Sequence, residues 1–244
     1  MRLRTLGSSS AGNCYILDNG WETLVIEAGV SFRKVQEALR FQTGRICGCI
    51  VSHQHNDHAK HIGRFIAAGI RVLALPCVFS SHDIVSSFAH PVEPGNGYKL
   101  GNFIVIPFGV KHDVPCVGYL ISHPDMGRLL FLTDTMTLDY RFTNLNHIMI
   151  EANYADDILQ DRIDRGEENP CRKDRLYETH MELETTKRIL KAQDMSQVSD
   201  IILIHLSDNN SDEERFVREV SQATGAIVSA ASAGFTTELI NHKA

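Results

Sequence analysis

Three histidines and an aspartate stand close together in the segment Val51-Ser-His-Gln-His-Asn-Asp-His-Ala-Lys60. The segment follows an apolar run that predicts a buried strand. His53 and His55 are two positions apart, so in an extended chain both imidazoles project to the same side. Asp57 and His58 then begin a stretch with helical spacing and come within reach of a second ion. Imidazole and carboxylate ligands suit zinc, manganese or iron. The segment therefore predicts a metal site, and a polar surface loop is the simpler alternative.

The pattern His53-x-His55-x-Asp57-His58 resembles the HxHxDH motif of the metallo-β-lactamase-fold hydrolases. This resemblance implies an α/β fold, a four-layer αββα sandwich of two mixed sheets flanked by helices. It also implies two divalent metal ions, zinc or manganese with iron as a further option, and three more ligands at later strand ends. Three residues match these positions: His112 after the apolar run Phe103–Phe108, Asp134 after Leu130–Leu132, and His205 after Ile201–Ile204.

The resemblance also implies which residue holds which ion. The first ion would be held by His53, His55 and His112. The second would be held by Asp57, His58 and His205, and Asp134 would bridge the two. An aspartate at the bridging position is typical of the thioesterase and phosphodiesterase branches, whereas the antibiotic-hydrolysing branch usually has a cysteine. His55 replaces the glutamate of the flavodiiron branch, which favours hydrolysis over electron transfer.

The expected chemistry follows from the ions. Two metals about 3.5–4 Å apart can share a water, lower its pKa from ~15.7 towards ~7, and present hydroxide to the attacked centre. Asp57 would help to orient that hydroxide. His180 is the candidate general acid that protonates the leaving alkoxide. It lies just before a predicted helix and is not needed for the metal set.

Other segments resemble the small YycJ/WalJ-like branch, a set of compact enzymes implicated in DNA exonuclease activity. The similar segments are the loop Gly7–Asn13, Glu151-Ala-Asn153 and His205-Leu-Ser207. Departures from the pattern occur at Thr179, Tyr154 and Glu27. The candidate substrate contacts are Ser8, Ser9, Asn13, Lys60, Asn153 and Ser207. The alternatives are that the serine loop is a tight turn, that Lys60 faces solvent, and that Asn153, Ser207, Glu151 and Asp113 brace the metal ligands.

Hydrophobic periodicity predicts alternating strands and helices in one domain over residues 1–244. The expected strands are Arg2–Leu6, Cys14–Leu17, Thr23–Glu27, Ile46–Ser52, Ile70–Leu75, Phe103–Phe108, Val117–Ser122, Arg128–Leu132, His147–Glu151 and Ile201–His205. The expected helices are Ser31–Leu39, Asp57–Ala68 with Asn56 as N-cap and Gly69 as stop, Val78–Phe88, Ala155–Arg165, Glu182–Ala192 and Asp212–Thr224. The charge-dense stretch Asp161–Arg175 is expected to be the least ordered, either as a substrate-facing loop or as a solvated linker.

Composition and apolar patterning indicate the expected cellular location, the state of the cysteines and the attraction to nucleic acid. No apolar run approaches the ~18 residues that span a bilayer, and the first residues lack the apolar stretch of a signal peptide. We therefore expect a cytoplasmic protein without membrane association. The six cysteines form no CxxC pair and are interpreted as reduced, mostly buried thiols; a site role for Cys116 is the alternative to plain burial. A net charge of −6 argues against broad attraction to nucleic acid. It does not exclude a nuclease, because two bound divalent ions would dominate the local field.

Three functions are consistent with these sequence features. The leading hypothesis is a dinuclear-metal phosphodiesterase, most simply a DNA exonuclease, with nucleic acid or a phosphodiester as substrate. The second is a thioester or lactone hydrolase that uses the same metal site. The third is a non-catalytic or metal-sensing protein, which would not require the complete ligand set.

Overall fold

The first sheet gathers most strands of the amino-terminal half. The computed structural model describes residues 1–169 and 171–241. For Cys171, Arg172, Asp174 and Arg175 it describes the backbone alone. The strand order is β14-β1-β2-β3-β4-β5-β6. Their bounds are β14 (Thr236–Glu238), β1 (Arg2–Gly7), β2 (Cys14–Asp18), β3 (Thr23–Ile26), β4 (Ile46–Ile50), β5 (Val72–Ala74) and β6 (Ala89–Pro91). The strands from β3 to β6 are parallel, whereas β1 pairs antiparallel with β2 and β14.

The second sheet has the order β13-β12-β11-β10-β9-β8-β7. Its strands are β7 (Tyr98–Leu100), β8 (Phe103–Val110), β9 (Cys116–His123), β10 (Gly127–Leu132), β11 (His147–Glu151), β12 (Asp200–Ile204) and β13 (Ile227–Ala230). The strands from β10 to β13 are parallel, and β7 to β10 form an antiparallel meander. The parallel strands of both sheets deliver their carboxyl ends to one edge of the molecule, where polar residues follow.

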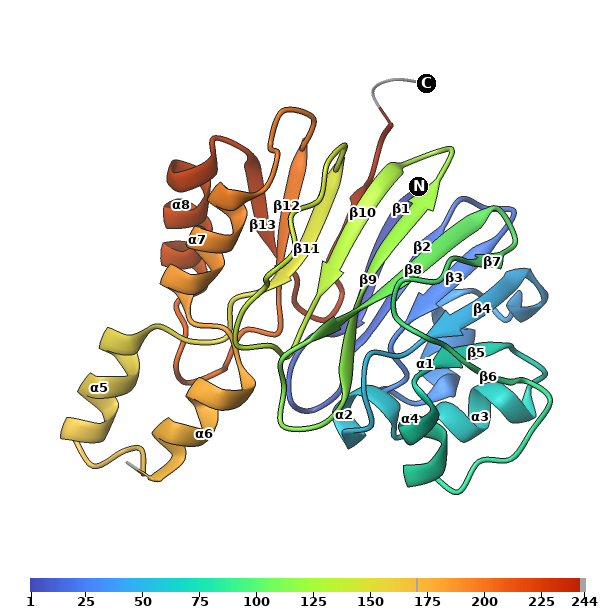
Figure 1. Ribbon diagram of the computed structural model, residues 1–244, viewed down its shortest axis with the longest axis horizontal. Helices are drawn as coiled ribbons and strands as arrows, with labels where there is room; N and C mark the ends of the chain where they lie inside the picture. Colours follow the sequence, from blue (N-terminus) through green and yellow to red (C-terminus); the bar gives the residue numbers. More distant parts are fainter. Residues whose placement is uncertain (170, 242–244) are drawn as a thin grey trace.

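Helices cover the outer faces of both sheets (Figure 1). On the first sheet lie α1 (Phe32–Ala38), α2 (Asn56–Ala59), α3 (Ile62–Ala67) and α4 (Pro76–Ser81). On the second lie α7 (Leu183–Ala192) and α8 (Glu213–Thr224). A short 3-10 turn, η1 (Thr43–Arg45), precedes β4. The helices α5 (Asp156–Asp164) and α6 (Cys171–Thr179) project beyond the sandwich as an arm (Figure 1). This arrangement confirms the predicted αββα sandwich.

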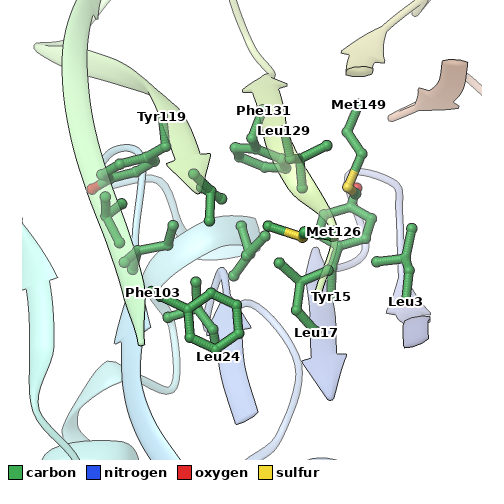
Figure 2. Close-up of a cluster of buried hydrophobic side chains, with 14 of the residues drawn as sticks. Leu3, Tyr15, Leu17, Leu24, Phe103, Tyr119, Met126, Leu129, Phe131 and Met149 are labelled. Atoms are coloured by element: carbon green, nitrogen blue, oxygen red, sulfur yellow. The ribbon is translucent and has the colours of Figure 1, made fainter. Parts of the chain in front are cut away.

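The period-2 alternation of the strands sorts their side chains between the layers. In β2, Tyr15 and Leu17 face the other sheet, whereas Cys14 and Ile16 face the helices. The inter-sheet core shown in Figure 2 is closed by aromatic rings from both sheets, with Tyr15 and Phe131 in an edge-to-face contact at 5.7 Å. Each fully buried side chain of this kind contributes about 1.5–3 kcal/mol. The core thus fixes the two sheets against each other and holds their shared polar edge.

One expected helix is two helices. The sequence predicts a continuous helix from Asp57 to Ala68, but α2 ends at Ala59 and α3 begins at Ile62. The backbone N–H of His61 donates to the carbonyl of Ala28 instead of continuing the helix. The predicted N-cap Asn56 is also wrong, because His55 occupies the cap position and makes no side-chain capping bond. Gly69, at φ +76°, ends α3 as expected.

Two further expectations need correction. The helix predicted for Val78–Phe88 is α4, which begins at Pro76 and ends at Ser81, so its second half is not helical. The stretch from Asp161 to Arg175 is not one loop, because α5 extends to Asp164 and α6 begins at Cys171. Pro170, part of that prediction, lies outside the described residues. Across the described ranges, no helix is both long and apolar enough to cross a membrane.

Candidate metal centre

The predicted ligands meet where strands of both sheets end. His53 and His55 follow β4, His112 follows β8, Asp134 follows β10 and His205 follows β12. Asp134 and His205 have φ values of +48° and +54°, a conformation in which non-glycine residues are uncommon. It turns each side chain sharply at the end of its strand. Such conformations cost free energy and cluster at functional sites. Ser8 supports one of them, since its hydroxyl accepts from the backbone N–H of His205 at 2.9 Å.

The first group of ligands is a trio of imidazoles. His55 Nδ1 lies 3.0 Å from His53 Nε2 and 3.2 Å from His112 Nε2. The outer ring nitrogens are held from behind: His112 Nδ1 donates to the carbonyl of Thr179 at 3.1 Å, and His53 Nδ1 lies 2.9 Å from the Ser52 hydroxyl. Protons held on the outer nitrogens leave lone pairs on the inner ones. The trio therefore fits a single divalent cation.

The second group mixes imidazoles and carboxylates. His58 Nε2 lies 3.2 Å from Asp57 Oδ2 and 3.4 Å from Asp134 Oδ2, and His205 Nε2 lies 3.4 Å from Asp57 Oδ2. Within residues 1–169 and 171–241, His205 Nε2 is buried without a hydrogen-bond partner. A buried ring nitrogen without a partner, beside the Asp57 carboxylate, fits a cation. Asp134 Oδ2 is also 3.8 Å from His53 Nε2, so this carboxylate lies between the two groups. That position suits the predicted bridge.

Buried polar groups hold these ligands from behind. Glu27, fully buried, has a carboxylate oxygen 3.5 Å from His58 Nδ1. Glu151 accepts from His180 Nδ1 at 2.7 Å and lies 3.3 Å from His205 Nδ1. The ring of His180 stacks on that of His205, with centroids 5.3 Å apart. Carboxylates that contact a ligand ring, as Glu27 and Glu151 do, fix its orientation, and their loss typically lowers metal affinity about 10–100-fold.

The residues predicted to touch substrate divide into two sets. A cleft of about 580 Å³ at the metal centre is lined by Ser9, Asn153, His180 and Ser207 from that prediction, together with His55, Asp57, His112, Asp134 and His205. Ser8, Asn13 and Lys60 do not line it. Ser8 supports His205, and Asn13 is fully buried with Nδ2 3.1 Å from His58 Nε2. Lys60 is exposed at the end of α2. Their contact with substrate therefore remains a prediction.

In the absence of metal, the histidines and carboxylates of the centre shift one another's pKa values. Burial alone lowers the pKa of His205, but the Asp134, Asp57 and Glu151 carboxylates raise it to about 10. The pKa of His58 is raised by Asp134 and Glu27 against the same effect of burial. Burial alone raises the pKa of Asp57, but His205 and His58 lower it well below its usual range. Without metal, the surrounding carboxylates therefore favour the protonated forms of His58 and His205.

Metal binding is therefore expected to release protons. At pH 7.5, His58 and His205 must each lose a proton before their nitrogens can bind a cation. We expect calorimetric titration of metal-free protein with zinc, in buffers of different ionisation enthalpy, to show release of about two protons. Apparent affinity should fall as the pH falls. Zinc binding without proton release would contradict this ligand assignment.

The same network makes the metal-free fold sensitive to pH. Because the pKa of His205 is higher in the folded chain than its ordinary ~6.5, its contribution to stability is complete below that pH. This contribution is lost as the pH rises towards 10.

A glycine allows the Asp57 backbone to come close to β3. A Cβ added to Gly29 would lie 1.7 Å from the carbonyl oxygen of Asp57. The Gly29→Ala substitution is expected to displace Asp57, reducing bound metal to below about half and destabilising the fold by several kcal/mol, of order 3. Gly63 in α3 is the matched control, because nothing lies near its added Cβ. Gly63→Ala should instead stabilise by about 0.5–1 kcal/mol. Thermal unfolding and elemental analysis measure both effects, and equal behaviour of the two variants would refute the argument.

Comparison with solved structures identifies the fold. The protein YhfI from Bacillus subtilis, described as a metallo-beta-lactamase fold protein, superposes with a TM-score of 0.72 over 97% of this chain and 98% of YhfI, at 16% identity. This chain has the metallo-β-lactamase fold. No family model matches it.

Two curated relatives are similar in sequence to this metallo-β-lactamase-fold chain. The exodeoxyribonuclease WalJ of Streptococcus pneumoniae is 25% identical over 170 residues, 64% of this chain and 63% of WalJ. The exodeoxyribonuclease YycJ of Bacillus anthracis is 25% identical over 179 residues, 66% of each chain. The match to WalJ thus spans less than two thirds of its length.

Several cleft residues were not predicted from the sequence. Glu168 and Leu176 come from the arm, and Asp208, Asn209 and Asn210 follow the last ligand. The polar run Ser207–Asn210 directly follows a predicted strand end. The sequence could therefore have indicated that Asp208, Asn209 and Asn210 line the cleft. The carbonyl of Thr179 that holds His112 has no side-chain signature. Only the three-dimensional course of α6 reveals it.

Proposed function

We propose that this chain is a metal-dependent phosphodiesterase that acts on nucleic acid, most simply as a DNA exonuclease. Its support is the convergence of the predicted ligands into two adjacent groups beside an open cleft. His53, His55 and His112 would hold one ion, and Asp57, His58 and His205 the other, with Asp134 between them. The exodeoxyribonuclease names of both curated relatives support the substrate class. Zinc, manganese and iron all suit these ligands.

The chain's own residues provide the setting for in-line displacement. Two divalent ions held there would neutralise charge on the phosphodiester and lower the pKa of a shared water. Asp57, on the cleft wall, would orient the attacking oxygen by accepting its hydrogen bond. Ser9 and Ser207 line the same cleft and carry neutral donors that suit non-bridging phosphate oxygens and sugar hydroxyls. Asn153 also lines it, but its Nδ2 donates to the His205 carbonyl at 2.8 Å and lies 3.1 Å from His205 Nδ1, so this residue braces a metal ligand.

The observation that favours a phosphodiester over a thioester is the pair formed by His180 and Glu151. The ring of His180 lines the cleft, and its Nδ1 donates to the buried Glu151 carboxylate at 2.7 Å. An imidazole held by a carboxylate can act as an acid. An alkoxide leaving group is strongly basic and needs that proton. A thiolate, with a thiol pKa of about 8.5, can leave without it.

The acidic lining of the cleft implies that a phosphodiester would bind there through the metal ions. Among its described lining residues there is no lysine or arginine, whereas Asp113, Glu168 and Asp208 stand in its wall. Attraction of an anionic strand would then depend on the bound ions, so oligonucleotide binding at this cleft should be lost in chelator.

The direct test compares substrates. We expect purified, manganese-loaded protein to shorten end-labelled DNA stepwise and to leave a generic thioester intact over the same time. If the thioester is cleaved while the DNA remains intact, the chain is an acyl hydrolase instead. An Asp57→Ala variant controls for contaminating nucleases.

A further inference from the structure

A second hollow, of about 570 Å³, lies at the end of the first sheet opposite the metal centre. Arg2, at the start of β1, pairs in register with Asp18 and Glu238, and all three line this hollow. Ser8, which follows β1, contacts His205 of the metal centre. Six extended residues at ~3.3 Å each separate the two places by roughly 20 Å. A ligand in this hollow is therefore not the phosphodiester under attack.

Arginines dominate the lining, and their carboxylate partners are fewer than the arginines. The cationic side chains are Arg2, Arg4, Arg40 and Arg45, and the acidic ones are Asp18, Asp125 and Glu238. The acids are already engaged: Asp18 with Arg4 at 2.9 Å, Glu238 with Arg2 at 2.7 Å, and Asp125 with the Asn19 amide at 2.7 Å.

The remaining cations are Arg40 and Arg45. In the part of the chain that the structure describes, the exposed Arg40 side chain makes no hydrogen bond or ion pair. Arg45 Nη1 donates to the carbonyl of Gly20, whereas its buried Nε has no hydrogen-bond partner among the described residues. The nearest carboxylate oxygen to Arg45 is on Asp18 at 3.9 Å, and that oxygen already accepts from the Gly20 N–H. Two arginines on the lining of a hollow, one of them exposed and without a carboxylate partner, favour an anionic ligand.

Two exposed aromatic rings flank these arginines. Trp21, the single tryptophan of the sequence, is 87% exposed and follows the lining residue Gly20; Phe41 is 68% exposed and follows Arg40. Arg40 and Phe41 have successive φ values of +50° and +61°, which are unusual for long or bulky residues. Large exposed rings that are next in sequence to residues lining an arginine-rich hollow suit a ligand with both a flat base and a phosphate.

We propose that this hollow is a binding site for a nucleotide unit, whose phosphate meets the guanidinium groups of Arg40 and Arg45 and whose base stacks on the flanking rings. The unit is either a free nucleotide or part of a single strand. This site is independent of the reaction at the metal centre and stands even if that reaction proves to be different.

Titration calorimetry of the metal-loaded protein with dAMP, and with a short single-stranded oligonucleotide carrying nuclease-resistant linkages, tests the site. Trp21 fluorescence provides a local signal in the same solutions. We expect binding with quenched emission, and Arg40→Ala should weaken it at least ~10-fold, as expected for loss of a charge-assisted hydrogen bond. Arg33→Ala, which removes an arginine 83% exposed on the neighbouring helix α1, should leave the affinity unchanged.

The two ligands distinguish the two sources. Comparable affinity for dAMP would assign the site to free nucleotides, and binding of the oligonucleotide alone would assign it to a strand. The proposal is overturned if the wild-type chain binds neither ligand, or if Arg40→Ala and Arg33→Ala bind with the same affinity as each other. A failure of the phosphodiesterase assay with an intact Arg40 effect would refute the catalytic proposal only.

Discussion

Replacing Asp134 by asparagine is expected to lower phosphodiester hydrolysis by more than ~10³-fold and to reduce bound metal. Asp134 Oδ2 lies 3.4 Å from His58 Nε2 and 3.8 Å from His53 Nε2, so one carboxylate serves both ligand groups. An amide keeps the volume but removes the negative charge that balances two cations. Turnover of DNA and elemental analysis of the purified variant measure the two effects.

The metal-free protein should respond to the same change. Asp134 is buried and is a main cause of the raised pKa of His205. Without that carboxylate, His205 should titrate at a lower pH, which nuclear magnetic resonance of the histidine rings can follow. Asp139→Asn is the matched control, because Asp139 is 69% exposed and pairs only at the surface with Lys111 among the described contacts. An Asp134→Asn variant within tenfold of wild-type activity would remove this residue from the centre.

The His180→Ala substitution is expected to have the second largest effect, a fall of about 10²–10³-fold in kcat on DNA. The same variant should hydrolyse bis(p-nitrophenyl) phosphate nearly as fast as the wild type, because p-nitrophenolate leaves without a proton. Metal content should be unchanged, since His180 lies outside both ligand groups assigned here. The contrast between the two substrates separates an acid from a structural support.

Glu151→Gln provides a finer test of the same pair. Burial lowers the pKa of His180, but Glu151 more than offsets this and raises it. Removing the charge of Glu151 should therefore shift the alkaline limb of the pH profile for DNA hydrolysis to lower pH. His90→Ala, at a histidine of the edge strand β6 that lies outside the cleft wall, is the control for loss of an imidazole. If the His180→Ala variant loses activity equally on DNA and on bis(p-nitrophenyl) phosphate, His180 has a positioning role instead.

The sequence predicted the sandwich and the neighbourhood of the ligands because these depend on local patterns. The apolar runs that end at His53, Asp134 and His205 are strands in the structure, and parallel strands place their ends at a common edge. The alternation of Tyr15 and Leu17 with Cys14 and Ile16 likewise determined which face looks into the core.

The remainder depended on contacts between distant segments. The break between α2 and α3 arises because His61 bonds to Ala28, which no helical periodicity encodes. The sequence predicted the helix α5, but the stretch Asp161–Arg175 was expected to be a loop or linker because its residues are charged. Tyr177 of α6 stacks on Tyr154 at 5.7 Å and anchors this helix to the sandwich. The short edge strands β6, β7, β13 and β14 were not predicted, because strands of three or four residues carry too little pattern.

Two ions bound in this centre are proposed to make the chain a phosphodiesterase. The most direct measurement is a titration of metal-free protein with manganese, in which bound ions and shortening of end-labelled DNA are followed in the same samples. We predict that DNA hydrolysis appears only as the second equivalent binds. Full hydrolysis without bound metal, or none when both equivalents are bound, would contradict it.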